Sequence, residues 1–118
     1  MSYKKIGTII QSLHEKTISG AITWEETEVD GTYQVSFPNY SVRIFSIKSS
    51  TDNDYFIQII NEFGKVLDEV SDIDLKDIID NPYKLMKEIH NSARRQALGV
   101  EDALDAILSN LDDLGIPF

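Results

Sequence analysis

The sequence predicts an α+β fold: a five-stranded antiparallel β-meander preceded by one N-terminal helix and followed by C-terminal helices. Apolar residues recur with a helical period at both ends of the chain and with a period of two between them. The connections between the expected strands are too short for parallel crossovers, so the strands must pair antiparallel. The 118 residues fit one domain, which we expect to span residues 1–118.

The N-terminal helix is expected over residues 2–18. One face of it carries Ile6, Ile9, Ile10, Leu13 and Thr17. Ser2 is the expected N-cap and Gly20 the expected C-terminal stop. We expect Ile10 and Leu13 to lie against the core.

Residues 21–24 and 32–37 alternate apolar and polar side chains and are the first two expected strands. The Asp30-Gly31 pair between them is typical of a two-residue type I′ hairpin turn. Pro38-Asn39 is expected to form the next turn.

Residues 40–47 continue the alternation until Ile44 and Phe45 place two apolar side chains side by side. This slip indicates either a β-bulge or a strand that is covered on both faces. Residues 55–60 have high β-propensity and form the fourth expected strand. Gly64 closes the last hairpin, and residues 65–70 return as the fifth strand.

Beyond the strands, residues 72–80 are expected to form a short helix or a pair of turns that ends at Asn81-Pro82. The helical period then resumes in a ladder of Met86, Ile89, Ala93, Ala97, Val100, Leu104, Ile107 and Leu111. Gly99 interrupts this ladder without breaking its phase. The chain therefore forms either one long helix through Gly99 or two helices separated at it.

The chain contains no cysteine. This excludes disulfide scaffolds, thiolate zinc sites, iron–sulfur clusters and cysteine nucleophiles, and it suits a reducing compartment. Apolar runs fall well short of the roughly 18 residues of a membrane span. We expect a cytoplasmic protein that carries no cofactor.

Few side chains suggest a catalytic or metal site. His14 and His90 are the two histidines, and neither has a second ligand at a converging position. Arg94-Arg95 is a small basic pair on a strongly acidic chain. These residues are expected to have structural roles, and we expect no enzymatic activity.

Two acidic segments resemble sites only superficially. Trp24 precedes Glu25, Glu26 and Glu28, but the alternation of a strand explains the spacing of these carboxylates, and Trp24 is expected in the core. Residues 52–54 lack the glycine and the distal glutamate of a calcium loop.

The distribution of charge is the most informative feature for function. The net charge is −9, and it is concentrated after the last strand and near the C-terminus, whereas residues 1–20 carry three lysines against one glutamate. Such a surface disfavours direct binding to nucleic acid or membrane. The predicted partner-binding residues are Asp72, Asp74, Asp77, Asp80, Glu101, Asp102, Asp105, Asp112 and Asp113.

Three segments resemble small uncharacterised bacterial α+β proteins: residues 20–24, 59–64 and 91–108. This resemblance implies a bacterial or phage origin. It implies no activity and assigns no residue to a site.

We therefore expect a non-enzymatic, acidic protein-interaction module. It would bind a basic protein, as an immunity or antitoxin-like protein does, or form a homodimer in which Ala93 and Ala97 allow close helix approach. One alternative is a small-ligand binder or enzyme with a pocket between sheet and helices lined by Tyr33, Tyr40 and Tyr55. Another alternative is a nucleic-acid mimic built from the acidic faces.

Overall fold

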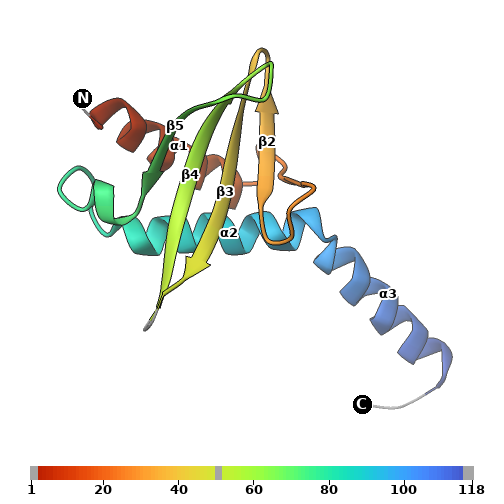
Figure 1. Cartoon of the computed structure of the whole chain (residues 1–118). Helices are drawn as coiled ribbons and strands as arrows, with labels where there is room; N and C mark the ends of the chain where they lie inside the picture. Colours follow the sequence, from red (N-terminus) through yellow and green to blue (C-terminus); the bar gives the residue numbers. More distant parts are fainter. Residues whose placement is uncertain (1–2, 50–51, 116–118) are drawn as a thin grey trace.

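The computed structural model describes residues 3–49 and 52–115. A helix, a five-stranded sheet, a short 3₁₀ turn and two further helices follow one another along the chain (Figure 1). The predicted α+β architecture and its order of elements are confirmed.

The sheet is an antiparallel meander in which each strand pairs with the next, in the order β1-β2-β3-β4-β5. The strands are β1 (Glu25–Glu26), β2 (Tyr33–Phe37), β3 (Tyr40–Lys48), β4 (Asn53–Asn61) and β5 (Val66–Ser71). The two long central strands, β3 and β4, pair over their full lengths.

The core lies between one face of this sheet and two helices, α1 (Lys4–Ile18) and α2 (Pro82–Ala97). Both helices lie behind the sheet in Figure 1. The strands send alternate side chains inward, so that Val35, Ile44 and Ile57 are buried. Ile10 and Leu13 of α1 are buried with them, as predicted.

The outer face of the sheet is largely polar. Arg43 donates to the Gln34 side chain and forms an ion pair with Glu28. The slip at Ile44 and Phe45 creates no bulge, because β3 and β4 stay in register there and the Phe45 ring stacks on Phe56. A register shift occurs instead between β4 and β5, at residues 59 and 60.

The predicted position of the first strand is wrong. Residues 21–24 do not pair, and β1 is limited to Glu25–Glu26. Trp24 is nevertheless buried, as expected, because its indole N–H donates to the Thr17 hydroxyl at 2.9 Å and its backbone N–H donates to the Gln96 side chain.

The connection from β1 to β2 is a six-residue loop, and the prediction of a two-residue type I′ turn is wrong. Gly31 has a positive φ of 79°, whereas Asp30 is not among the residues with positive φ, which type I′ requires at both central positions. The Thr27 hydroxyl holds the wider loop together by bonding to the carbonyl groups of Val29 and Thr32.

The other predicted turns are confirmed. Residues 38–39 link β2 to β3, and Asn39 takes the left-handed conformation with φ 71°. Gly64 has φ 83° at the β4–β5 turn, where the Asn61 side chain accepts from the backbone of Phe63 and Lys65.

Helix α1 stops close to the predicted residue, because Gly20 turns the chain with φ 78°. Its N-cap is Tyr3, and the predicted cap Ser2 lies outside the described residues. Gly7 permits a close approach, since a Cβ there would meet the Ile78 side chain at 2.8 Å.

Residues 72–80 form turns around the short 3₁₀ helix η1 (Ile73–Leu75), in agreement with the prediction. Asn81 then takes a left-handed conformation, and its side chain accepts from the Lys84 N–H to cap α2. Pro82 occupies the first turn of α2, where it is favourable.

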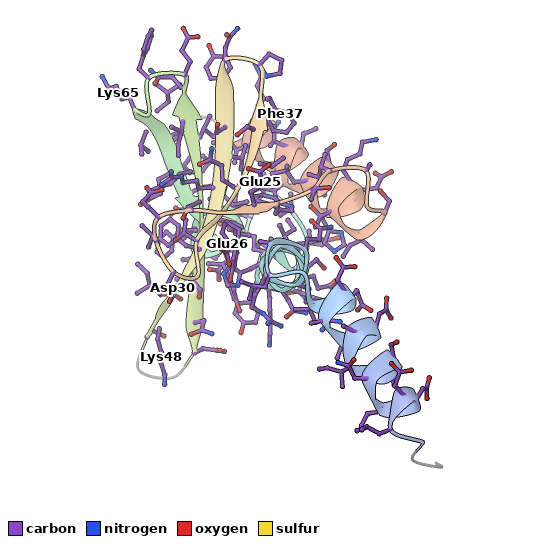
Figure 2. The ribbon with its side chains drawn as sticks, turned by 90° about the vertical axis from the view of Figure 1, so that its right-hand side faces the viewer. Glu25, Glu26, Asp30, Phe37, Lys48 and Lys65 are labelled. Carbon is purple, nitrogen blue, oxygen red and sulfur yellow. The ribbon has the colours of Figure 1, made fainter. Side chains whose placement is uncertain are left out.

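The C-terminal ladder forms two helices, so the alternative of one continuous helix is wrong. Gly99 has φ 65°, in the left-handed region that a helix interior excludes. Helix α3 (Val100–Asp113) then leaves the body (Figures 1 and 2). The radius of gyration is accordingly 16.8 Å, against about 13.5 Å for a compact chain of this length.

Candidate interaction surface

Helix α3 is an amphipathic helix that is not packed against the body. None of its 14 residues is buried. We call its apolar positions the apolar stripe: Val100, Leu104, Ile107, Leu108 and Leu111. At 3.6 residues per turn these side chains share an arc of about 100°. Exposed fractions of 45% for Leu104, 54% for Ile107 and 59% for Leu108 show that the described chain does not cover this stripe.

The acidic residues of α3 occupy the opposite arc. Five of the nine predicted partner-binding residues lie here: Glu101, Asp102, Asp105, Asp112 and Asp113. All five are exposed, and they span about 120° of the helix circumference. The stripe is therefore bordered by negative charge.

A short junction connects α3 to the body. The Arg95 guanidinium forms an ion pair with Glu101 across Gly99. Gln96, one turn before the junction, accepts a hydrogen bond from the backbone N–H of Trp24. The side chain of Gln96 is thus the last polar tie between the helical ladder and the core.

The other four predicted residues lie at the opposite end of α2. Asp72 is buried and accepts a 2.8 Å hydrogen bond from the Tyr55 N–H, while Asp74 accepts from the Ser71 N–H at 2.9 Å. These two carboxylates hold the chain where β5 passes into η1. Asp77 and Asp80 are exposed. The nine residues therefore do not form one surface.

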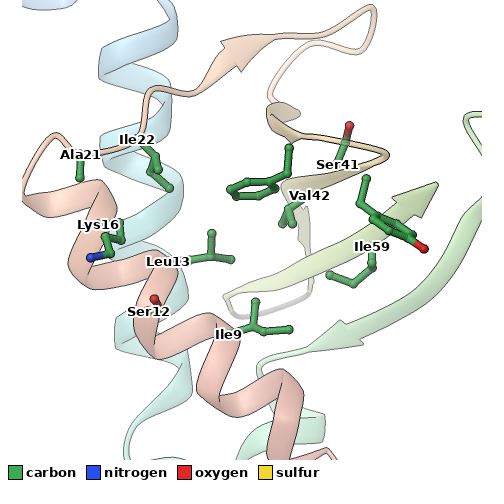
Figure 3. A pocket seen from close by; sticks show the side chains of 11 residues that line it. Ile9, Ser12, Leu13, Lys16, Ala21, Ile22, Ser41, Val42 and Ile59 are labelled. Carbon is green, nitrogen blue, oxygen red and sulfur yellow. The ribbon is translucent and has the colours of Figure 1, made fainter. Parts of the chain in front are cut away.

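A second surface feature is an apolar groove between α1 and the sheet, which encloses about 610 Å³. Ile9 and Leu13 of α1 and Ile22 of the following loop form one wall (Figure 3). Phe37, Tyr40, Val42 and Ile59 of the sheet form the other wall. We call this feature the α1–sheet groove.

The groove has a buried floor and an exposed apolar rim. Leu13 and Val42 are each 5% exposed, whereas Ile9, Phe37 and Tyr40 are 36%, 44% and 52% exposed. Apolar rims of this kind occur at protein interaction sites and ligand grooves.

Lysines of α1 lie at both ends of the groove. Lys16 lines it near the end of the helix. Lys4 and Lys5 line an adjoining hollow that shares Ile9 with the groove. The ends of the groove therefore carry positive charge, whereas α3 carries negative charge.

The sequence prediction placed Tyr40 in a pocket between sheet and helices but did not identify the other residues of the groove, although one further signal was present. Phe37 and Tyr40 flank the exposed Pro38-Asn39 turn. The conformation of this turn does not require large aromatic residues at either side. Their position opposite α1 depends on how helix and sheet pack, which no local pattern specifies.

Two expectations about surfaces are wrong. Ala93 is fully buried in the core, and Ala97 packs against that core, so the pair cannot form a dimer interface. The three predicted pocket tyrosines do not come together. Tyr40 lines the groove, whereas Tyr33 and Tyr55 are buried and flank the His90 ring at centroid distances of 5.4 and 5.6 Å.

The two histidines bind structural partners. His14 Nε2 lies 3.2 Å from a carboxylate oxygen of Glu88 and joins α1 to α2. His90 Nε2 lies 2.9 Å from the carbonyl oxygen of Gly31 and ties α2 to the β1–β2 loop. Within residues 3–49 and 52–115, no three His, Cys, Asp or Glu side chains are grouped so that they could hold a metal ion.

The carboxylates near Trp24 do not face one another across a cleft. Strand β1 ends at Glu26, and Glu28 lies in the loop that follows, paired with Arg43 at 2.9 Å (Figure 2 shows β1 and the loop to Asp30). Backbone hydrogen bonding, followed by the Arg43 guanidinium, lowers the pKa of Glu28.

One strongly shifted tyrosine stabilises a loop. Tyr83, in the first turn of α2, donates a 2.9 Å hydrogen bond to Asp52. This bond raises the pKa of Tyr83 to about 12 and lowers the pKa of Asp52. Neither residue lines the groove or belongs to α3, and their hydrogen bond joins the start of α2 to the start of β4.

Comparison of the chain with family models, with curated proteins and with solved structures gave no match. The resemblance to small bacterial α+β proteins stays a prediction. Among the helices in the described part of the chain, none has the length and apolar character needed to cross a membrane.

Proposed function

We propose that this protein is a non-enzymatic interaction module that docks onto its partner through α3. One observation carries the proposal: a 14-residue amphipathic helix projects from the body with no residue buried. An isolated helix of this length is marginal in water, and most helical stability in proteins comes from packing the apolar face. A partner that covers the apolar stripe would supply that packing.

The charge of α3 defines the kind of partner. Five acidic residues and no basic residue lie between Val100 and Asp113. A fitting partner presents an apolar groove with basic residues at its rim. Opposite charges would accelerate association and disfavour acidic competitors, and salt would weaken the complex.

The test uses a matched pair of variants on the two faces of α3. Ile107→Glu places a charge in the apolar stripe, and Ser109→Glu adds the same charge on the acidic arc. In extract of the source organism, wild type and Ser109→Glu should retain the same protein, whether it is a second copy of the chain or another protein, and Ile107→Glu should not. The retained amount should fall as salt is raised. Equal retention by both variants, or binding that is insensitive to salt, would contradict the proposal.

A further inference from the structure

We propose that the α1–sheet groove receives α3 from a second copy of this chain, so that two copies exchange helices in a symmetric dimer. This inference rests on the proposed docking function of α3 and names its partner. In the described part of the chain, the stripe is an exposed apolar helix face and the groove is an apolar hollow that could receive one.

The charges of the two surfaces are complementary. Residues 1–20 carry Lys4, Lys5 and Lys16 against one glutamate, and α3 carries five acidic residues. Lys4-Lys5 and Lys16 lie about 17 Å apart along α1 at 1.5 Å per residue. Glu101 and Asp112, the two acidic residues next to the apolar stripe, lie about 17 Å apart along α3. The spacing of the lysines therefore matches the spacing of the acidic residues nearest the docked face.

Charge also argues against the simpler pairing of α3 with α3. That arrangement would place two helices with five acidic residues each and no basic residue against one another, and like net charge on two partners is unfavourable even with the acidic arcs on the outer sides. Docking in the groove removes this repulsion.

Two reciprocal contacts bury enough area for a stable dimer. A helix about 21 Å long and 10 Å wide, half covered by a groove, buries roughly 330 Å² of its own surface. Both sides of two such contacts give about 1,300 Å², within the range of about 1,200–2,000 Å² for specific interfaces.

The position of α3 favours a second copy over its own groove. Gly99 and the Arg95–Glu101 ion pair direct α3 away from the body, past the end of α2 (Figures 1 and 2). Helix α3 therefore extends away from the body, and its exposed stripe is available to another chain.

The first experiment compares full-length variants by sedimentation velocity over a range of concentrations. Phe37→Glu charges the groove rim, and Phe63→Glu is its matched control, since Phe63 is 84% exposed at the β4–β5 turn. Ile107→Glu and Ser109→Glu form the second matched pair. The fluorescence of the buried, sole tryptophan, Trp24, verifies that each variant folds.

We expect wild type, Phe63→Glu and Ser109→Glu to dimerise. Phe37→Glu and Ile107→Glu should each weaken the dimer at least about 30-fold, as expected for a residue central to an interface. A dimer lost in Ile107→Glu but intact in Phe37→Glu would overturn the groove inference and leave the docking function standing. A dimer unaffected by both variants would overturn the groove inference, because neither surface would then mediate self-association, and the extract test alone would decide the docking function. A wild-type monomer at every concentration, or a groove filled by an apolar small molecule in native mass spectrometry, would overturn the inference.

The second experiment uses the absence of cysteine to place unique thiols. A Phe37→Cys chain is mixed under mild oxidation with a Leu108→Cys chain of different mass. The mixed disulfide should predominate, and replacing Phe37→Cys by Phe63→Cys should abolish it. Predominant Leu108→Cys self-pairing would establish α3–α3 contact instead. An intrachain disulfide in the dilute double variant would show closure within one chain, and either result overturns the inference.

Discussion

Helices α2 and α3 continue one apolar ladder, yet they have opposite environments. Met86, Ile89 and Ala93 of α2 are fully buried, whereas Leu104 and Ile107 of α3 are about half exposed. Both helices have the apolar spacing of three and four residues that predicts an amphipathic helix. The comparison teaches that the pattern specifies a helix with an apolar face but does not specify what covers that face.

The junction between the two helices explains the difference. Up to Gln96 the ladder faces the sheet and α1, and Gln96 itself bonds to Trp24. Gly99 then takes the left-handed conformation and redirects the chain beyond the edge of the sheet. After this point the body offers the apolar side chains nothing to pack against.

The largest expected effect on the unfolding free energy comes from truncating an isoleucine to alanine, once in α2 and once in α3. Ile89→Ala should destabilise the protein by about 2–5 kcal/mol, because it opens a cavity in a fully buried site. Ile107→Ala should change the unfolding free energy of the monomer by less than about 0.5 kcal/mol, because no described residue packs on it. Urea denaturation at low protein concentration measures both values. Equal losses would show that α3 is part of the core.

The polar tie near the end of α1 gives the next largest effect. Thr17→Val removes the buried acceptor of the Trp24 indole N–H and should cost about 1–3 kcal/mol, because a buried donor is left without a partner. Thr8→Val is the matched control, since the exposed Thr8 hydroxyl bonds only to the carbonyl group of Lys4 one turn earlier. Thermal unfolding of the two variants tests this. Similar melting temperatures would contradict the assignment of Thr17 as an anchor of the body.

A substitution at Gly99 tests the junction directly. The left-handed conformation costs alanine about 1–2 kcal/mol, so Gly99→Ala should favour a continuous helix at the junction. Residues 95 and 101 would then point to different faces and lose their ion pair. Backbone chemical shifts of residues 98–100 report the change. Gly99→Asn is the control, because asparagine tolerates the left-handed region, and unchanged shifts in Gly99→Ala would contradict the prediction.

The smallest effect concerns the loop held at the start of α2. The hydrogen bond between Tyr83 and Asp52 raises the pKa of Tyr83 to about 12, from the ordinary tyrosine value of 10.0. The bond therefore stabilises the fold below pH 10, and this contribution is lost as the pH rises through 12. The same bond lowers the pKa of Asp52, so its contribution is also lost when the pH falls through that lowered value.

Tyr83→Phe should remove the alkaline dependence and leave α3 unaffected, and it should only reduce the acidic dependence, because the backbone N–H of Asn53 also lowers the pKa of Asp52. Ultraviolet titration of tyrosinate should lose one late-ionising group in this variant. Tyr40→Phe is the control, because Tyr40 lies 52% exposed at the groove rim. An unchanged alkaline titration in Tyr83→Phe would contradict the assignment.

Predictions from sequence were accurate where local chemistry decides the structure. Gly20, Asn39 and Gly64 take left-handed conformations at the predicted stops and turns, since few residues tolerate that region. The loop after β1 was predicted wrongly, because the Thr27 hydroxyl bonds across it and stabilises a wider connection than Asp30-Gly31 favours alone.

The candidate site was predicted only in part. The acidic face of α3 was identified from its residues, whereas Asp72 and Asp74 proved to hold the chain after β5. The residue type alone does not distinguish an aspartate exposed on the surface from an aspartate whose carboxylate accepts a hydrogen bond from the backbone. Only the position of Tyr55 beside Asp72 distinguishes them.

The sequence by itself determined the order of helices and strands, the antiparallel pairing and the amphipathic character of α3, because these follow from periodicity, turn residues and short connections. The tertiary structure alone decided which apolar faces are covered. Burial depends on how separate elements pack together, and the α1–sheet groove and the exposed stripe of α3 exist only once that packing is fixed.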